Sequence, residues 1–257
     1  MTAGTAAAPP IVELGDLLLA MADDEFVIGF SDSEWTGIAP LLEEDVAMSS
    51  LSQDELGHAA ALYGLLGELT GTDPDAIAYD RAPADYRHAR LLDHGRGDWA
   101  MTIARRYLYE TSDAVRLLAL AGGSWRPLAD LVAKLQREER YHGMHIGSWF
   151  ERLAAADGEP RDRLLAALET LAPDAATVFT PLPGEPALIE AGILARPWSD
   201  IEAEWRATIR PVFERHRLPL PPPTADPEHG RSSHGADFEW LYGEFTRVRR
   251  SDPGATW

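Results

Sequence analysis

The chain has 257 residues, contains no cysteine and carries a formal net charge of −19. The lack of cysteine excludes disulfides, thiolate catalysis and metal sites held by cysteine, including iron–sulfur clusters. The acidic charge argues against a nucleic-acid partner and against an anionic membrane surface, because both require a basic surface on the protein. No apolar run approaches the length of about 18 residues that indicates a transmembrane helix. We therefore expect a cytoplasmic protein with a sizeable apolar core.

Apolar residues recur at helical spacing along most of the chain, and no alternating strand pattern competes with them. Residues 1–10 lack a basic segment and a long apolar run, so they are predicted to be a short disordered leader and not a secretory signal. Two segments, residues 73–97 and 181–188, contain prolines and glycines and are predicted to be irregular. The predicted helices cover residues 11–30, 39–69, 98–121, 127–155, 161–179, 198–215 and 235–249.

Two of these helices carry the same short motif, a glutamate followed three residues later by a histidine. The first copy is Glu55 with His58, and the second is Glu139 with His142. Residues three apart lie on one face of a helix, so a carboxylate and an imidazole placed in this way can bind one metal ion together. A single copy is expected by chance in a chain so rich in glutamate. Two copies, each inside a helical pattern, favour a metal site.

A further glutamate precedes each motif at nearly the same distance. Glu25 lies 30 residues before Glu55, and Glu110 lies 29 residues before Glu139. Two antiparallel helices that meet near their middles require about 11 residues on each arm and a loop of about 2–8 residues, which sums to about 30. The spacing therefore predicts two helix pairs with their ligands at one level of the bundle.

This ligand set is typical of one architecture. A glutamate from each of two helices and a Glu-x-x-His motif from each of two others bind two metal ions in ferritin-like carboxylate proteins. We therefore predict an all-α fold, a ferritin-like four-helix bundle over about residues 11–155, with a C-terminal helical extension over about 160–257. Residues 11–257 are predicted to form a single domain. The predicted metal ligands are Glu25, Glu55, His58, Glu110, Glu139 and His142.

Other polar residues near the motifs have simpler interpretations. His145 is interpreted as a core or surface histidine, because six ligands already suffice. His88 and His94 lie in the irregular segment and are expected to be solvated. Tyr109, beside Glu110, is expected to pack or to donate a hydrogen bond to a carboxylate. The two acidic residues before Glu25 must point elsewhere.

Several stretches resemble the phenylacetic acid catabolism family, which comprises the large subunits of the bacterial phenylacetyl-CoA epoxidase, a ring 1,2-oxygenase. The flanking residues are most similar to the PaaC-type subunit. The resemblance extends over almost the whole chain after about residue 12. The stretches that carry it are Gly29–Pro40, Gln53–Ala59, Ile103–Tyr107, Arg137–His142, Gly230–His234 and the final Trp257.

The chain departs from the PaaC-type pattern at the ligand positions. The resemblance implies a catalytic subunit with a full di-iron ligand set and a PaaC-type structural subunit that has lost several ligands. This chain has a carboxylate or an imidazole at all six positions. Glu110 stands where aspartate is usual, and its side chain is one methylene longer. The sequence thus indicates a PaaC-type chain with an intact ligand set.

The resemblance implies a subunit of a multicomponent di-iron oxygenase. Glu55 and Glu139 would bridge two iron ions, Glu25 and Glu110 would be terminal ligands, and each histidine would bind one ion. Its implied partners are a homologous subunit, a separate reductase that supplies electrons and an aryl-CoA substrate whose ring receives one oxygen atom. Manganese, alone or mixed with iron, is an alternative metal.

Two other functions stay open at this stage. One is a metal-free PaaC-type structural subunit that supports the catalytic subunit. The other is a self-contained ferritin-like di-metal protein with a different substrate. The outer partners of the two predicted histidine ligands also stay open, because Asp54 and Glu138 are too close in sequence to assign.

Overall fold

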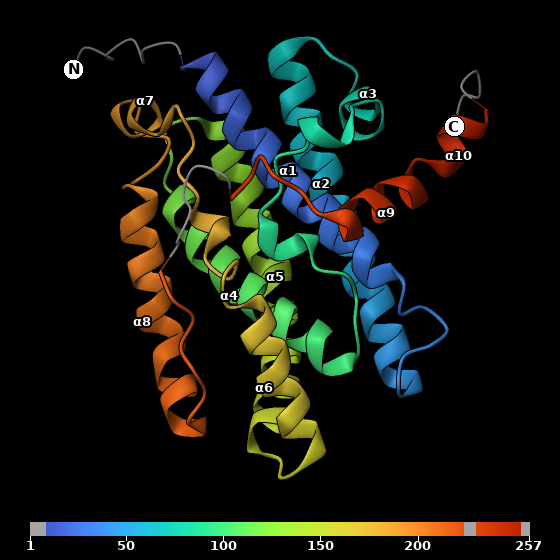
Figure 1. Ribbon diagram of the computed structural model, residues 1–257. Helices are drawn as coiled ribbons and strands as arrows, with labels where there is room; N and C mark the ends of the chain where they lie inside the picture. Colours follow the sequence, from blue (N-terminus) through green and yellow to red (C-terminus); the bar gives the residue numbers. More distant parts are fainter. Residues whose placement is uncertain (1–8, 224–229, 253–257) are drawn as a thin grey trace.

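The computed structural model describes residues 9–223 and 230–252, and within these ranges the protein consists of helices without a β-strand (Figure 1). The all-α prediction is confirmed. In the described ranges, no helix combines the length and the apolar character that a membrane span requires. The predicted leader falls mostly on residues 1–8, which lie outside the described residues.

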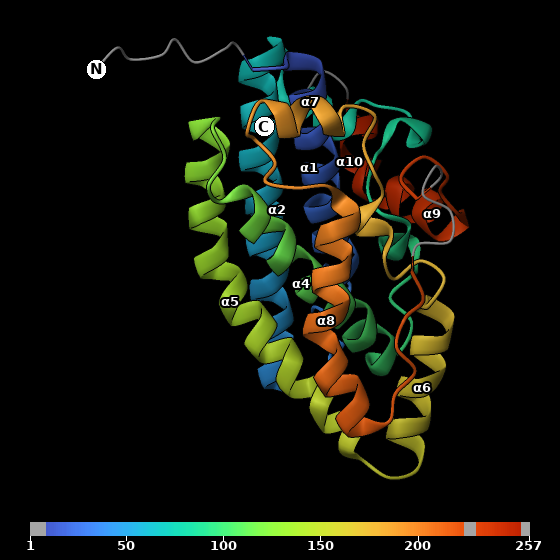
Figure 2. The same cartoon turned by 90° about the vertical axis from the view of Figure 1, so that its left-hand side faces the viewer.

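Four long helices form the centre of the molecule. They are α1 (Ile11–Ser33), α2 (Leu42–Thr70), α4 (Trp99–Leu120) and α5 (Arg126–Ala155). α1 packs along α2, α4 packs along α5, and α2 also contacts α5, so the two pairs form one bundle (Figures 1 and 2). Most of their buried apolar side chains belong to one core, whereas Met48 and Leu51 of α2 form a small second cluster with Trp35.

The C-terminal helices cover two sides of this bundle. α6 (Glu159–Leu171) and α8 (Trp198–His216) pack against α4, whereas α7 (Glu185–Glu190) and α9 (Ala236–Phe245) contact α1. The short helix α10 (Arg247–Ser251) continues from α9, at the opposite edge from α8 (Figure 1). The Phe26 and Phe245 rings meet edge to face at 5.0 Å. This contact holds α9 against the turn of α1 that carries Glu25.

The structure corrects several predicted boundaries. The fifth predicted helix ends at Leu171, not at 179, because Pro173 has no backbone N–H with which to continue the helical hydrogen bonds. A separate 3₁₀ turn, Thr177–Phe179, follows. The segment predicted to be irregular at 73–97 contains α3 (Pro74–Tyr79) and two 3₁₀ turns, Pro83–Asp85 and Arg90–Asp93. The connection predicted at 181–188 contains the start of α7.

The contact between α1 and α2 depends on a glycine. A Cβ atom on Gly29 would lie 3.0 Å from Leu56 Cγ and 3.2 Å from the Ser52 carbonyl oxygen. We expect Gly29→Ala to lower the unfolding free energy by about 1–3 kcal/mol, because the two helices must separate. A Cβ atom on Gly57, in α2, would have no neighbour within 4 Å. Gly57→Ala is therefore the control and should stabilise the protein by up to about 1 kcal/mol. Equal effects of the two substitutions in urea denaturation would contradict this interpretation.

Candidate metal centre

The structure brings the six predicted ligands together in the middle of the bundle. Each of the four long helices contributes at least one of them, and every one is buried, with exposed fractions between 0% and 8%. The glutamate of α1 faces the motif on α2, and the glutamate of α4 faces the motif on α5, as the matched spacing predicts. The residues are Glu25 from α1, Glu55 and His58 from α2, Glu110 from α4, and Glu139 and His142 from α5.

The ligand atoms form two overlapping groups. His58 lies with Glu25, and His142 lies with Glu110, and both groups share Glu55 and Glu139. Within each group the candidate ligand atoms are no more than 4.8 Å apart. Glu139 Oε1 is 3.1 Å from His58 Nδ1 and 3.3 Å from His142 Nδ1. We refer to the two groups as the His58 position and the His142 position.

The outer nitrogen of each histidine contacts a carboxylate from the facing helix. His58 Nε2 lies 2.9 Å from Glu138 Oε2, and His142 Nε2 lies 3.2 Å from Asp54 Oδ2. Asp54 and Glu138 are the residues directly before the two shared glutamates. Such outer partners fix the ring orientation and leave the Nδ1 atom free to bind a metal ion.

Among the described residues, the inward-facing atoms of the cluster have no hydrogen-bond partner. Buried polar atoms are almost always paired in folded proteins, so a group of unpaired ones requires an explanation. A bound cation supplies one, since carboxylate oxygens with a minority of imidazole nitrogens suit iron or manganese. The residues therefore fit a pair of metal ions. The unpaired atoms are Glu25 Oε2, Glu55 Oε2, His58 Nδ1, both carboxylate oxygens of Glu110, Glu139 Oε1 and His142 Nδ1.

Crowding of charge shifts the pKa values of the cluster in opposite directions. Burial, reinforced by the neighbouring Glu55, raises the pKa of Glu25 well above its ordinary value. Burial would also raise the pKa of Glu55, but the Arg106 guanidinium holds it well below its usual range. Burial opposes protonation of His142, yet the adjoining carboxylates of Glu139 and Glu55 raise its pKa to about 11. Without a metal ion, the cluster therefore holds several protons that a cation would displace.

Arg106 is a member of the site that the spacing argument missed. Its side chain is fully buried, and its Nη1 donates to Glu55 Oε1 at 2.5 Å. Its Nε lies 3.2 Å from Glu110 Oε1 and 3.2 Å from Asp32 Oδ2. The available signal was its position four residues before Glu110, which places both side chains on one face of α4.

The acidic residues before Glu25 point away from the metal centre, as predicted. Asp23 accepts hydrogen bonds from Tyr63 and Arg81, and Asp24 binds Arg116 and Arg231. The prediction that Tyr109 packs or donates a hydrogen bond to a carboxylate is confirmed, because its hydroxyl donates to Glu25 Oε1 at 2.9 Å. Glu25 on α1 is thus held by a neighbour on α4.

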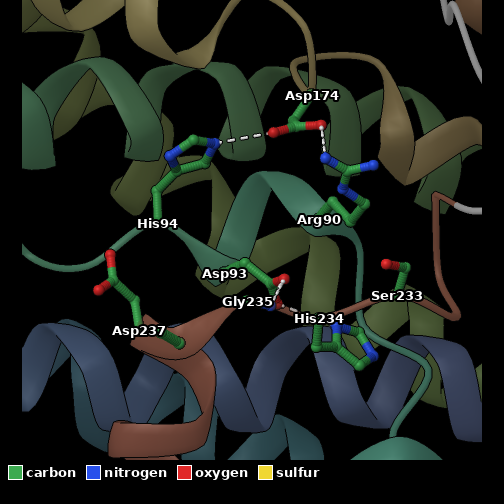
Figure 3. A pocket seen from close by; sticks show the side chains of 9 residues that line it. Arg90, Asp93, His94, Asp174, Ser233, His234, Gly235 and Asp237 are labelled. Atoms are coloured by element: carbon green, nitrogen blue, oxygen red, sulfur yellow. Dashed lines mark hydrogen bonds and ion pairs between the residues drawn. The ribbon is translucent and has the colours of Figure 1, made fainter.

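The prediction of solvated histidines in the 73–97 segment is wrong for His88. This side chain is fully buried, its ring stacks on His234 at 4.0 Å, and its Nε2 lies 2.5 Å from Asp93 Oδ1. His94 is partly buried and lies 2.9 Å from Asp174 Oδ2 at a second pocket (Figure 3). The C-terminal segment covers this region, which explains why sequence position alone suggested exposure.

The buried His88 predicts a loss of stability in mild acid. Burial lowers its pKa, although Asp93 opposes the shift. The unfolded chain binds a proton near the ordinary histidine pKa of about 6.5, so the unfolding free energy falls as the pH drops below that value. His234 and Asp23 are the other titratable groups that act on this ring. Urea denaturation at about pH 7.5 and about pH 5.5 measures how far the unfolding free energy falls between the two pH values. In His88→Gln this fall should be smaller than in the wild type by up to about 1 kcal/mol. An unchanged loss in the variant would contradict this assignment.

A cavity of about 420 Å³ lies between α4, α5 and α8 and reaches the metal centre. Glu110 and Glu139 line it beside the apolar side chains of Ala114, Val115 and Leu118. Gly143, one turn from Glu139 on α5, also lines the cavity, and a Cβ atom there would meet no described atom within 4 Å. The cavity therefore offers apolar space next to the His142 position.

Comparison with known proteins agrees with the resemblance in the sequence. Residues 5–257 match the family described as phenylacetic acid catabolic protein. Over 241 residues the chain is 28% identical to the C subunit of 1,2-phenylacetyl-CoA epoxidase from Escherichia coli (strain K12). That alignment covers 93% of this chain and 97% of the relative. The chain belongs to the phenylacetic acid catabolic protein family.

Proposed function

We propose that this chain is a metal-bearing subunit of a multicomponent oxygenase of the phenylacetyl-CoA epoxidase type, active in aerobic phenylacetate degradation. Membership of the family and similarity to a named epoxidase subunit support the oxygenase assignment. The observation that carries the metal assignment is the convergence of six intact ligands whose inward-facing atoms have no hydrogen-bond partner. A cytoplasmic location is part of this proposal.

The residues of this chain suit the task of holding two divalent ions in a dry site. A pair of reduced iron ions, or of manganese ions, would activate O2 and supply the oxygen atom that enters the substrate. Four glutamates balance the four positive charges, and the contacts of Asp54 and Glu138 orient the two histidines. With no cysteine in the chain, the electrons must come from a separate reductase.

The cavity beside Glu110 and Glu139 suits the aromatic ring of an aryl-CoA. An apolar cavity of about 150 Å³ is enough to bind benzene, and this one measures about 420 Å³. A ring placed there would lie beside two ligands of the His142 position, while the bulky CoA group would remain outside.

Filling this cavity should separate substrate binding from metal binding. A leucine at 143 would point back along α5 over the turn that carries Glu139, and space is free for its Cβ atom. We expect Gly143→Leu to retain its metal ions and to lower the turnover of phenylacetyl-CoA at least about tenfold. Gly64→Leu is the control, because Gly64 lies in α2, outside this cavity, and its Cβ position is also open. Full activity of Gly143→Leu would show that the ring does not enter this cavity.

The proposed function is tested by reconstitution with the homologous large subunit and a reductase. Phenylacetyl-CoA is supplied with O2, and mass spectrometry detects a product that has gained one oxygen atom. The proposal expects a stable complex whose turnover is lost when His142→Ala replaces the native chain. Turnover that is unchanged by this substitution would instead support the structural-subunit alternative. Failure to form a complex would favour a self-contained di-metal protein.

One observation favours the structural-subunit alternative. Arg106 neutralises part of the carboxylate cluster, as a bound cation would, so the metal-free bundle has an internal source of positive charge. In this alternative, the four glutamates and two histidines would be polar residues of a metal-free structural subunit.

A further inference from the structure

The two metal positions differ in what already occupies their ligands. At the His58 position, Glu25 Oε2, Glu55 Oε2, His58 Nδ1 and Glu139 Oε1 are buried and have no hydrogen-bond partner. The other oxygen of Glu25 accepts the Tyr109 hydroxyl and lies 3.5 Å from Arg116, so both groups stay outside the cluster. An ion can enter this position without displacing a protein group.

At the His142 position, a guanidinium is already present. Arg106 Nη1 donates to Glu55 Oε1, and this oxygen lies 3.6 Å from His142 Nδ1. Arg106 Nε also lies 3.2 Å from Glu110 Oε1. Two of the four ligands of this position are therefore engaged by a cation in the metal-free chain.

We propose that Arg106 makes the two positions unequal: the His58 position binds a divalent ion first, and the His142 position binds its ion only as Arg106 withdraws from Glu55. The inference rests on the proposed metal-bearing function and adds an order of binding to it. The fixed charge of the guanidinium repels a divalent ion beside it. The ion must also replace a charge-assisted hydrogen bond, which lowers affinity by about 10- to 100-fold.

The structure provides a place to which Arg106 can withdraw. Its Nε lies 3.2 Å from Asp32 Oδ2, a carboxylate outside the cluster, and its Nη2 has no hydrogen-bond partner among the described residues. Asp32 also accepts a hydrogen bond from Arg105 at 2.6 Å, so this carboxylate stays fixed. A rotation about the Nε atom that keeps the Asp32 contact would move Nη1 and therefore free Glu55 Oε1.

The first test is a titration of the metal-free wild-type chain with Mn²⁺, followed by electron paramagnetic resonance and calorimetry. The first equivalent should bind at least about tenfold more tightly than the second and should give the spectrum of an isolated ion. A spin-coupled spectrum should appear only with the second equivalent. His142→Ala should abolish the weaker binding and retain the tighter, whereas His58→Ala should remove the tighter binding.

The second test changes Arg106 itself. Arg106→Gln retains a hydrogen-bond donor without the charge, and it should bring the two affinities to within about threefold of each other. Arg81→Gln is the matched control, because Arg81 binds the buried carboxylate of Asp23 but contacts neither Asp32 nor any residue of the cluster. It should leave the tenfold difference intact. If Arg106→Gln does not fold, the wild type and the two histidine variants still decide the question.

Three results would overturn the inference. They are equal or cooperative binding of two ions by the wild type, a tight ion that depends on His142, or an affinity difference that Arg106→Gln leaves unchanged. In each of these the chain still binds metal, so the proposed function survives. A wild-type chain that binds no Mn²⁺ and no Fe²⁺ would overturn the metal-bearing function together with the inference.

Discussion

Replacing Glu139 with alanine is expected to remove both metal ions from the protein. The Oε1 atom of Glu139 faces both histidines, at 3.1 Å and 3.3 Å, so one substitution takes a ligand from each position. Loss of an outer partner of a metal ligand typically costs about 10- to 100-fold in affinity, and loss of a shared ligand should cost more. The measurement is iron per chain after anaerobic loading with Fe²⁺ and removal of unbound metal. Glu55 is less suitable for this test, because its removal also frees Arg106.

The control for this substitution lies on the same helix. Glu151 is about half exposed and forms ion pairs with Arg215 and His216, near the end of α5. Glu151→Ala should retain as much iron as the wild type. If Glu139→Ala also retained the wild-type amount, the metal would have to bind outside the cluster.

Replacing Arg116 with methionine is expected to lower the unfolding free energy by about 3–5 kcal/mol. The side chain is almost fully buried, binds Asp24 and lies 3.1 Å from the Tyr109 hydroxyl, and its Nε donates to Asp113 Oδ1 at 2.7 Å. Burial raises the pKa of Asp113 to about 6 even with Arg116 beside it. Asp24 keeps Arg231 in the variant, but Asp113 is left as a buried carboxylate without its cation. Urea denaturation of the metal-free protein at about pH 7 measures the loss.

An exposed arginine provides the comparison for Arg116. Arg163 forms ion pairs with Glu159 and Asp98 on the surface. Pairs of this kind contribute little, because water screens both charges. Arg163→Met should therefore leave the urea midpoint almost unchanged. If the two variants lost similar amounts of unfolding free energy, burial would not determine how much the ion pairs of Arg116 stabilise the protein.

The long helices could be predicted because their apolar periodicity extends over many turns. Short elements could not be predicted in this way. Asp73 and Pro74, which were predicted to start an irregular segment, begin α3 instead, where the Asp73 side chain caps the Asp75 amide. Six residues are too few to show a period. The early end of α6 was readable from Pro173, although the apolar residues beyond it suggested continuation.

The ligands of the candidate centre were predictable for a different reason. Helical geometry fixes the spacing within each Glu-x-x-His motif, and loop length fixes the spacing between helices. The pairing of His58 with Glu138 depends on how α2 and α5 are rotated relative to each other, which sequence spacing does not reveal. Burial of His88 likewise depends on the return of the C-terminal segment, where Phe238 lies 4.2 Å from the ring.

Arg106 illustrates the limit of a ligand count. All six candidate ligands can be identified from residue type, yet the buried arginine among them decides how strongly two of them are available to a metal ion. A cationic residue one turn from a ligand glutamate on the same helix is a signal that sequence analysis can use. Such a residue can compete with a metal ion for the glutamate, so the presence of all ligands in a sequence does not mean that all of them are free to bind metal.

The most direct test of the metal centre is the metal content of the wild-type chain. The purified protein is dialysed to equilibrium against excess Fe²⁺ without oxygen, beside a Glu139→Ala/His142→Ala variant, and bound iron is measured by mass spectrometry. We expect about two iron ions per wild-type chain and none in the variant. No bound iron in the wild type, with a variant of equal stability, would contradict the proposal and identify the six residues as polar groups of a structural subunit.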